Sequence, residues 1–403
     1  MAMNLNMAGG AQGMMKEGST LAAGVDEAVL KNIGATKQLA KIVQSSLGPN
    51  GMKKLIINHL GKTLVSSDCG TIARELEVVH PAAQMVSMAS AAQDSEVGDG
   101  TNLVVSFSGE LLKLAEELLR TGLHTSEIVQ GYELAYAECV RVLPELEVAR
   151  VKNVRDAAEV AKAIEPVVAA KHEGVEGILS KVIADACVAV LPPAPEAPIL
   201  KADQVRIAKL RGGDVASSTM MKGMIVMRPS ETTVQQLEDR SKVVAFNCGV
   251  EMATTETKGT VLIRTADELI NYNKSEERAL EAIVKEIADS GVKLVISGGS
   301  VSEMAVHFLE KYQLMCLKIT SKWELRRLCG ATGCTALVRL GAPTPEEMGS
   351  VSKVSTKELG GRTVTVLEQL GDAQTKIATV VLRAATASLI RSSISAARAS
   401  RPS

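Results

Sequence analysis

The chain has 403 residues, which is enough for two or three domains of ordinary size. Its 45 Lys and Arg residues nearly balance 46 Asp and Glu residues, and aromatic residues make up only 2% of the chain. This composition argues against a nucleic-acid partner, which needs a basic surface and usually stacking aromatic side chains. The hydrophobic content of 46% allows sizeable cores, which we expect to be aliphatic.

The cysteine pattern and the N-terminal residues bear on the cellular compartment of the protein. The seven cysteines are scattered, and none forms a C-x-x-C pair, as is typical of a reducing environment. The Gly-, Ala- and Met-rich start lacks the apolar stretch of a signal peptide. No segment approaches the ~18 apolar residues of a membrane span. We therefore expect a cytoplasmic protein with no membrane partner.

The first part of the chain is predicted to be mainly helical. Residues 1–24 resemble a flexible arm, and apolar residues recur at helical spacing over 25–46. Turn residues then stop this helix, and short strands are predicted at 54–57 and 63–65. Further helices are predicted at about 72–79, 80–94, 103–120, 126–146 and 153–191.

The pattern changes after a proline-rich stretch at 192–198, which indicates a stiff linker. Buried strands are predicted at 223–227, 242–246, 292–296 and 315–319. Helices are predicted between and after them, at 265–290, up to about Tyr312, and at 321–328. This alternation favours an α/β domain. In the last helix we expect the apolar residues to lie in the core, namely Trp323, Leu325 and Leu328.

The strongest local signal for function is the pentapeptide from Gly98 to Asn102, which opens a predicted helix. Glycines at 98 and 100 allow the backbone to approach a phosphate chain, and the free N–H groups of a helix start favour anions. Asp99 is placed to hold Mg²⁺ that bridges phosphate oxygens, and Thr101 adds a polar donor. The alternative is an ordinary glycine-rich loop with an aspartate cap.

Two weaker candidates precede this loop. The turn Leu47-Gly48-Pro49 exposes backbone that a nucleotide could contact, although most such turns only reverse the chain. Asp68 precedes a predicted helix, where a carboxylate is either an N-cap or a site residue. Gly61-Lys62-Thr63 resembles the end of a P-loop, but Ile56 occupies the position of the required glycine, so this is not a Walker A motif. The five histidines show no metal-binding spacing.

Taken in order, these motifs resemble the type II chaperonins of the TCP-1 family. The resemblance covers roughly residues 12–383 and is carried by the segments 47–51, 67–72, 77–83 and 96–102. Two later segments, 255–263 and 321–329, resemble one subunit type of that family in particular. The resemblance implies a multidomain fold, with mainly α-helical equatorial and intermediate parts and an α/β apical domain.

The resemblance also implies domain boundaries. After the arm (1–24) it predicts the N-terminal half of an equatorial domain (25–147) and the first part of an intermediate domain (148–222). An apical domain follows at 223–378, with a helical protrusion near 251–280. Residues 379–403 would begin the return intermediate segment and end in a divergent tail.

The family's cofactors are ATP and Mg²⁺, and the resemblance implies a role for each motif. The residues implied to bind the nucleotide are Leu47, Gly48, Pro49, Gly98, Asp99, Gly100, Thr101 and Asn102, with Asp99 as the metal ligand. Asp68 would help to position or activate the attacking water. The family's usual Asp-Gly-Ala-Thr here reads Asp68-Cys69-Gly70-Thr71, so the carboxylate is kept while the loop differs.

The implied function is ATP-dependent protein folding by one subunit of a hetero-oligomeric double ring. Its partners would be the other subunits and unfolded clients such as actin and tubulin, and hydrolysis would drive lid closure. After Arg383 the sequence departs from the family, and the expected second catalytic Asp and Gly-Gly-Gly loop are missing. We therefore expect the chain as written to bind ATP weakly and to be inactive as a hydrolase. The alternatives are an ATP-independent binding module and a non-functional gene-model fragment.

Overall fold

The computed structural model describes residues 25–58, 61, 63–172, 174–193, 195–238, 240–251, 265–369 and 376–386. The described chain forms two compact units that divide between Lys181 and Val182. We call the described residues up to Lys181 unit 1, and those from Val182 to residue 386 unit 2. The predicted arm, residues 252–264 of the predicted protrusion and the tail beyond 386 lie outside the described residues.

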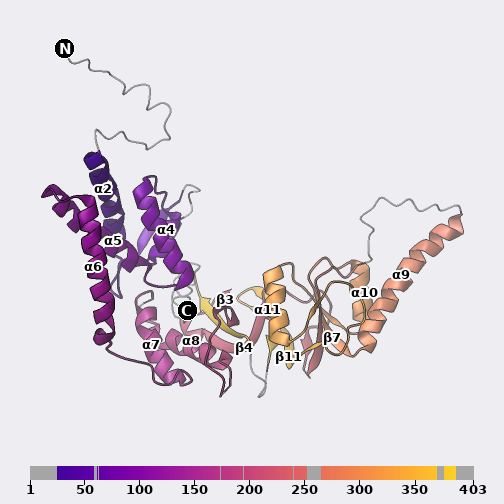
Figure 1. Ribbon diagram of the computed structural model, residues 1–403. Coiled ribbons are helices and arrows are strands. Elements are labelled where there is room, and N and C mark those ends of the chain that lie inside the picture. The colour runs from indigo at the N-terminus through magenta and orange to yellow at the C-terminus, as the bar shows by residue number, and fades with distance from the viewer. Residues whose placement is uncertain are drawn as a thin grey trace, which may run out of the picture. The chain divides into compact units, whose positions relative to one another are not determined.

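Unit 1 is mainly helical, as the sequence predicted (Figure 1). A short antiparallel hairpin interrupts its helices and pairs Lys54 with Ser66. The elements in order are α2 (Val25–Gln44), β1 (Lys54–Ile57), β2 (Thr63–Ser66), α3 (Cys69–Glu75), α4 (Pro81–Glu96), α5 (Thr101–Arg120), α6 (Thr125–Val142), the 3₁₀ helix η1 (Leu143–Leu146) and α7 (Ala157–Ala169).

The helices α2 and α5 run antiparallel and very close together. A Cβ atom added at Gly109 of α5 would clash with the Cβ of Ala40 of α2, so no larger residue fits at 109 without a shift. Lys37 pairs with Glu116 farther along the same contact. This register places the end of α2 beside the start of α5, and aliphatic residues such as Val43 and Val105 fill the space between the helices and α3.

The predicted continuous helix over 153–191 is wrong. The structure ends α7 at Ala169 and begins α8 (Glu176–Val190) only after a break. Gly174 in this break has a φ of +87°, a left-handed conformation that glycine adopts readily but that ends a right-handed helix. The break matters because it contains Lys171.

Unit 2 contains two sheets and confirms the predicted α/β pattern. The larger sheet has six strands in the order β3 (Val205–Arg211), β13 (Ala378–Ala384), β4 (Thr219–Val226), β12 (Arg362–Glu368), β11 (Lys353–Leu359) and β5 (Gln236–Leu237). Only β3 and β13 pair in parallel. The boundaries predicted after 222 and 378 fall inside β4 and at the start of β13, and they stay predictions.

The second sheet has the order β10 (Gly349–Val351), β6 (Ser241–Phe246), β7 (Val292–Ser297), β8 (Met315–Lys318), and β9 (Ala336–Leu337) also pairs with β6. The β6, β7 and β8 strands are parallel. In β7, Leu294 and Ile296 enter one buried cluster while Val295 enters another, as the alternation of strand side chains requires. The central strand is therefore covered on both faces.

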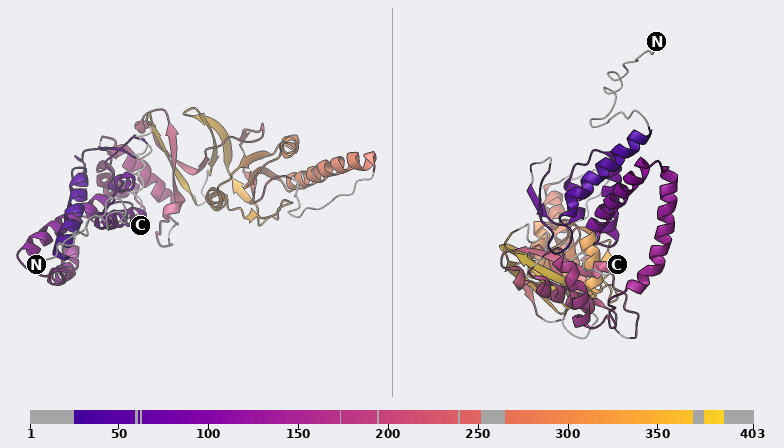
Figure 2. Two further views of the ribbon diagram at one scale, coloured as in Figure 1. Left: turned by 90° about the horizontal axis from the view of Figure 1, so that it is seen from above. Right: turned by 90° about the vertical axis from the view of Figure 1, so that its left-hand side faces the viewer.

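Three helices accompany this second sheet: α9 (Ala266–Asp289), α10 (Glu303–Lys311) and α11 (Lys322–Thr332). The last turns of α9 pack beside α10, through Leu280 and Val284, while its first half extends away from the sheet (Figure 2). In α11, Leu325 and Leu328 are buried, as predicted. The prediction for Trp323 is wrong: the side chain is 68% exposed. No helix in the described part of the chain has the length and apolar content to cross a membrane.

Candidate functional site

The site is built where the end of α2 meets the starts of α3 and α5, all within unit 1. Asn102, in the first turn of α5, donates from Nδ2 to the Val43 carbonyl oxygen at 3.0 Å and to Ser46 Oγ at 3.3 Å. Thr101 accepts a hydrogen bond from the Gly70 N–H at 3.3 Å. These bonds fix the turn after α2 and the start of α3 against the glycine loop that precedes α5.

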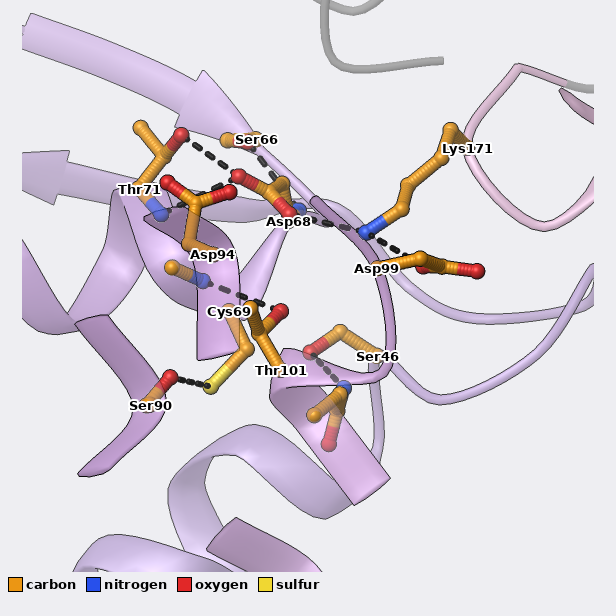
Figure 3. A network of polar contacts seen from close by, with 12 residues as sticks. Ser46, Ser66, Asp68, Cys69, Thr71, Ser90, Asp94, Asp99, Thr101 and Lys171 are labelled. Carbon is orange, nitrogen blue, oxygen red and sulfur yellow. Dashed lines mark hydrogen bonds and ion pairs between the residues drawn. The ribbon is translucent and has the colours of Figure 1, made fainter. Parts of the chain in front are cut away.

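Asp68 is the most enclosed carboxylate of the site (Figure 3). It is the N-cap of α3, and its Oδ2 accepts from the Thr71 N–H at 3.1 Å and from Thr71 Oγ1 at 2.7 Å. Its own N–H donates to Ser66 Oγ at 3.1 Å. Asp68 is therefore an N-cap, which was one of the two alternatives, and its role in a nucleotide site stays a prediction. Capping occupies Oδ2, whereas Oδ1 accepts from Lys171.

Lys171 supplies the cation that the sequence did not reveal. Its Nζ donates to Asp68 Oδ1 at 2.8 Å and lies 3.5 Å from Asp99 Oδ1 (Figure 3). The Lys171 and Asp68 side chains are almost fully buried, whereas the Asp99 side chain is 34% exposed. The three groups form a triad of two carboxylates and one ammonium, open to solvent on the Asp99 side.

Burial and pairing act in opposite directions on this triad. Burial alone would raise the pKa of Asp68, but the charge and hydrogen bond of Lys171, with the hydrogen bonds from Thr71, hold that pKa below its usual value. Burial alone would likewise lower the pKa of Lys171, but Asp68 and then Asp99 raise it above its usual value. Asp68 and Lys171 are consequently both charged near neutral pH and form a buried ion pair.

The glycine loop has the geometry expected of a phosphate-binding loop. Gly98 and Gly100 have φ values of +81° and +77°, and Gly100 is the N-cap of the 20-residue helix α5. Gln93 donates to the Asp99 carbonyl oxygen at 3.0 Å and anchors the loop. The unpaired N–H groups of the first turn of α5 provide a partial positive charge that favours an anion.

The predicted site residues divide into those that face the site and those that support it. Asp68 and Asp99 converge on one cation, Lys171, and their roles in a nucleotide site stay predictions. The Thr101 and Asn102 side chains instead bind inside the protein, which leaves their backbone N–H groups for an anion. Leu47 is exposed, and Gly48 turns the chain with a φ of +81°. The sequence signal for Lys171 was weak: one lysine shortly before a glycine, in a stretch read as helix.

The residues also fit a Mg²⁺ ion held together with phosphates. Among the described residues, no group of three His, Cys, Asp or Glu side chains is arranged to bind a metal alone. Mg²⁺ typically keeps several waters and takes only one or two carboxylates plus substrate phosphates. The half-open Asp99, beside an anion-favouring helix start, matches that mode of binding.

Comparison with known proteins gives a consistent result. The model of the TCP-1/cpn60 chaperonin family matches residues 39–398. T-complex protein 1 subunit theta of Arabidopsis thaliana is 45% identical over 94% of this chain and 69% of its own length. The Homo sapiens and Dictyostelium discoideum subunits theta are 44% and 43% identical, over 97% and 94% of this chain and 70% of their own lengths.

The theta type is the one that the segments 255–263 and 321–329 had indicated, so this prediction is confirmed. The family match, over residues 39–398, extends through both units. On this shared identity and order of motifs, the chain belongs to the TCP-1/cpn60 chaperonin family.

Proposed function

We propose that this protein is an ATP-dependent chaperone subunit whose nucleotide site is the triad and glycine loop of unit 1. The observation that carries the proposal is the contact of Lys171 with both Asp68 and Asp99, directly beside the first turn of α5. A buried cation between two carboxylates, next to an anion-favouring helix start, is suited to exchange its carboxylate partner for a phosphate.

The binding part of the site uses backbone and one carboxylate. The loop Gly98–Gly100 and the α5 N–H groups would hold the phosphates, and Asp99 would hold Mg²⁺, which neutralises phosphate charge when bound. The turn Leu47-Gly48-Pro49, tied to α5 through Asn102, would line the nucleotide. Hydrogen bonds already present in the protein thus fix this turn relative to the phosphate-binding loop.

The hydrolytic part of the site uses Asp68 and Lys171. In the structure, Lys171 occupies Oδ1 of Asp68. A phosphate near Asp99 would attract the Lys171 ammonium and free Oδ1 to orient a water molecule for in-line attack. Thr71 keeps Oδ2 fixed during this exchange, so the carboxylate retains its direction.

The assembly and its clients follow from the relatives' names and from unit 2. Because the relatives are named as subunits of T-complex protein 1, we propose that this chain joins other subunits in a hetero-oligomeric double ring in the cytoplasm. Unfolded proteins such as actin and tubulin would bind unit 2 at α11 and the loop 298–302. The exposed Trp323 of α11 also supports a second candidate, an ATP-independent binding module.

Photolabelling with an azido analogue of ATP tests the nucleotide site residue by residue. We expect Mg²⁺-dependent labelling of the tryptic peptide Ile42–Lys53, which contains the turn 47–49. Asp99→Asn should abolish the Mg²⁺ dependence and Lys171→Met should weaken labelling, whereas Glu110→Gln, farther along α5, should leave it unchanged. Labelling that ignores both site variants would refute the nucleotide site, and client binding that persists without any labelling would favour the binding module.

A further inference from the structure

The end of α11 brings two cysteines together through its own capping geometry. Gly333 has a φ of +77°, and its N–H donates to the Cys329 carbonyl oxygen at 2.8 Å. In a helix end of this kind, the residue after the left-handed glycine packs back on the residue whose carbonyl accepts that bond. At the end of α11, the residue after this glycine is Cys334, and the residue whose carbonyl accepts the bond is Cys329.

The contacts around the pair hold Cys334 in place. Cys334 lies in a buried cluster of unit 2, Cys329 packs against the same cluster, and the two thiols are close enough to interact electrostatically. Thr332 Oγ1 lies within donating distance of Cys334 Sγ, at 3.1 Å. Gly349 of β10 packs closely against Cys334, since a Cβ added at Gly349 would lie 2.9 Å from the Cys334 Cβ. Cys334 is buried, whereas Cys329 is partly exposed and open to a small oxidant.

The pair also differs electronically from other buried cysteines of the protein. The hydrogen bond from Cys329 lowers the pKa of Cys334 to about 7, although burial opposes this change. Burial raises the pKa of Cys69 to about 11 and that of Cys316 to about 12. Thiolates are the reactive form of cysteine, so reactivity should concentrate at the end of α11.

We propose that Cys329 and Cys334 are an oxidation site, at which a hydroperoxide converts the two thiols into a reversible disulfide. Two other cysteines provide a contrast: Cys139 is exposed on α6, and Cys69 packs against the Ser90 hydroxyl. The relevant property of this site is therefore the proximity of a second thiol on a fixed helix end. Exposure of a single thiol is not enough.

The reaction proceeds in two balanced steps. The Cys329 sulfur attacks one peroxide oxygen while its proton passes to the Cys334 thiolate, the O–O bond breaks, and hydroxide (or alkoxide) leaves. Cys334 then attacks the sulfur of the resulting sulfenic acid, the S–O bond breaks, and the oxygen leaves as water with the Cys334 proton. Two electrons pass from the thiols to the peroxide, and a dithiol reductant reverses the change by thiol–disulfide exchange.

Mass spectrometry can test this directly, because one tryptic peptide, Leu328–Arg339, contains both cysteines. The purified chain is treated with hydrogen peroxide, its free thiols are alkylated, and it is digested with trypsin. We expect this peptide to appear unalkylated and lighter by two hydrogen atoms, and to become doubly alkylated after treatment with dithiothreitol. In the same sample, the Cys139 peptide should show a sulfenic acid trapped by dimedone and no internal disulfide.

The Cys334→Ala variant separates the two steps. Without its partner, Cys329 should accumulate as a dimedone-trapped sulfenic acid, which should be scarce at Cys329 in the unchanged chain. The proposal is overturned if the Leu328–Arg339 peptide stays doubly alkylated at peroxide concentrations that modify Cys139. Dimedone labelling of Cys329 to the same extent in both proteins would overturn it too. The peptide mass in the unchanged chain stands as a test even if the variant does not fold.

Discussion

The two units bury different kinds of side chain. Unit 2 encloses an aliphatic core on both faces of a parallel sheet, with Leu294 and Ile296 fully buried. Unit 1 buries a charged pair, Lys171 with Asp68, yet leaves much apolar surface open on α6, where Leu134 and Tyr136 are 70% and 71% exposed. Apolar residues of α2, α4, α5 and α6 also line an open groove of about 400 Å³ in unit 1.

This difference indicates where stability and where function reside. Apolar burial stabilises a fold in proportion to area and needs no particular orientation. A buried ion pair gives little net stability, but removing one partner leaves an uncompensated charge and is strongly destabilising. The stability of unit 2 should therefore depend mainly on the volume of its buried apolar side chains. The stability of unit 1 should depend more on keeping both partners of its buried ion pair.

Removal of buried volume from unit 2 should have the largest effect. We expect Leu294→Ala to lower the free energy of unfolding of unit 2 by about 2–5 kcal/mol, because it removes a fully buried side chain and leaves a cavity. Hydrogen exchange of peptides from β6 and β7 should report this loss while unit 1 peptides stay unchanged. Equal loosening of both units would contradict the view that unit 2 is stabilised by its own core.

Loss of the cation from the triad should have the next largest effect. We expect Lys171→Met to lower the free energy of unfolding of unit 1 by roughly 3 kcal/mol, because Asp68 stays buried without its partner. The matched control is Lys113→Met, which removes an exposed partner of Glu110 and should cost at most about 1 kcal/mol. If the two variants unfold at the same urea concentration, the triad is not a buried ion pair in solution.

The pH dependence of unit 1 should reveal Asp68. Because its folded pKa is lowered, the stability from Asp68 is complete above the ordinary aspartate pKa of ~3.9 and is lost as the pH falls through the folded value. The pKa of Lys171 is raised, so its contribution persists below ~10.4 and disappears only as the pH rises through its folded value. We expect Asp68→Asn to flatten the acid limb of the unit 1 unfolding curve between pH 5 and about pH 3. An unchanged acid limb would contradict the lowered pKa.

The fold could be predicted well where local pattern and local structure agree. Parallel strands such as 242–246 and 292–296 are short apolar runs whose burial does not depend on distant sequence. The helix break after α7 was missed because alanine and valine continue the helical pattern up to it, and a single Gly174 is a weak stop signal. Strands β3 and β13 were missed as partners because their pairing joins residues far apart in the chain.

The site could be predicted in part for a related reason. Asp68 and Asp99 precede helix starts, so their turn residues made them visible in the sequence. Lys171 lies in no motif, and only the folded chain brings its ammonium, just after the end of α7, to Asp68. A long-range ion pair of this kind leaves no periodic pattern in the sequence, because it needs only one residue from each of two distant segments.

Truncation of an exposed leucine in unit 1 should have the smallest effect on stability and therefore sharpens the comparison most. Leu134→Ala is the same chemical change as Leu294→Ala, but the Leu134 side chain is 70% exposed, so little burial is lost and no cavity forms. Alanine is also a slightly better helix former than leucine, which offsets part of the small loss. We expect the free energy of unfolding of unit 1 to change by no more than about 0.5 kcal/mol.

Self-association should respond to Leu134→Ala although stability does not, because contiguous exposed apolar surface promotes association. Light scattering of the variant at increasing protein concentration should show a lower apparent mass than that of the unchanged chain. Lys113→Met, on α5, adds apolar surface to unit 1 and should shift the mass in the opposite direction. A loss of several kcal/mol from Leu134→Ala would mean that α6 is packed in solution, and that the two units do not differ in the way their buried residues indicate.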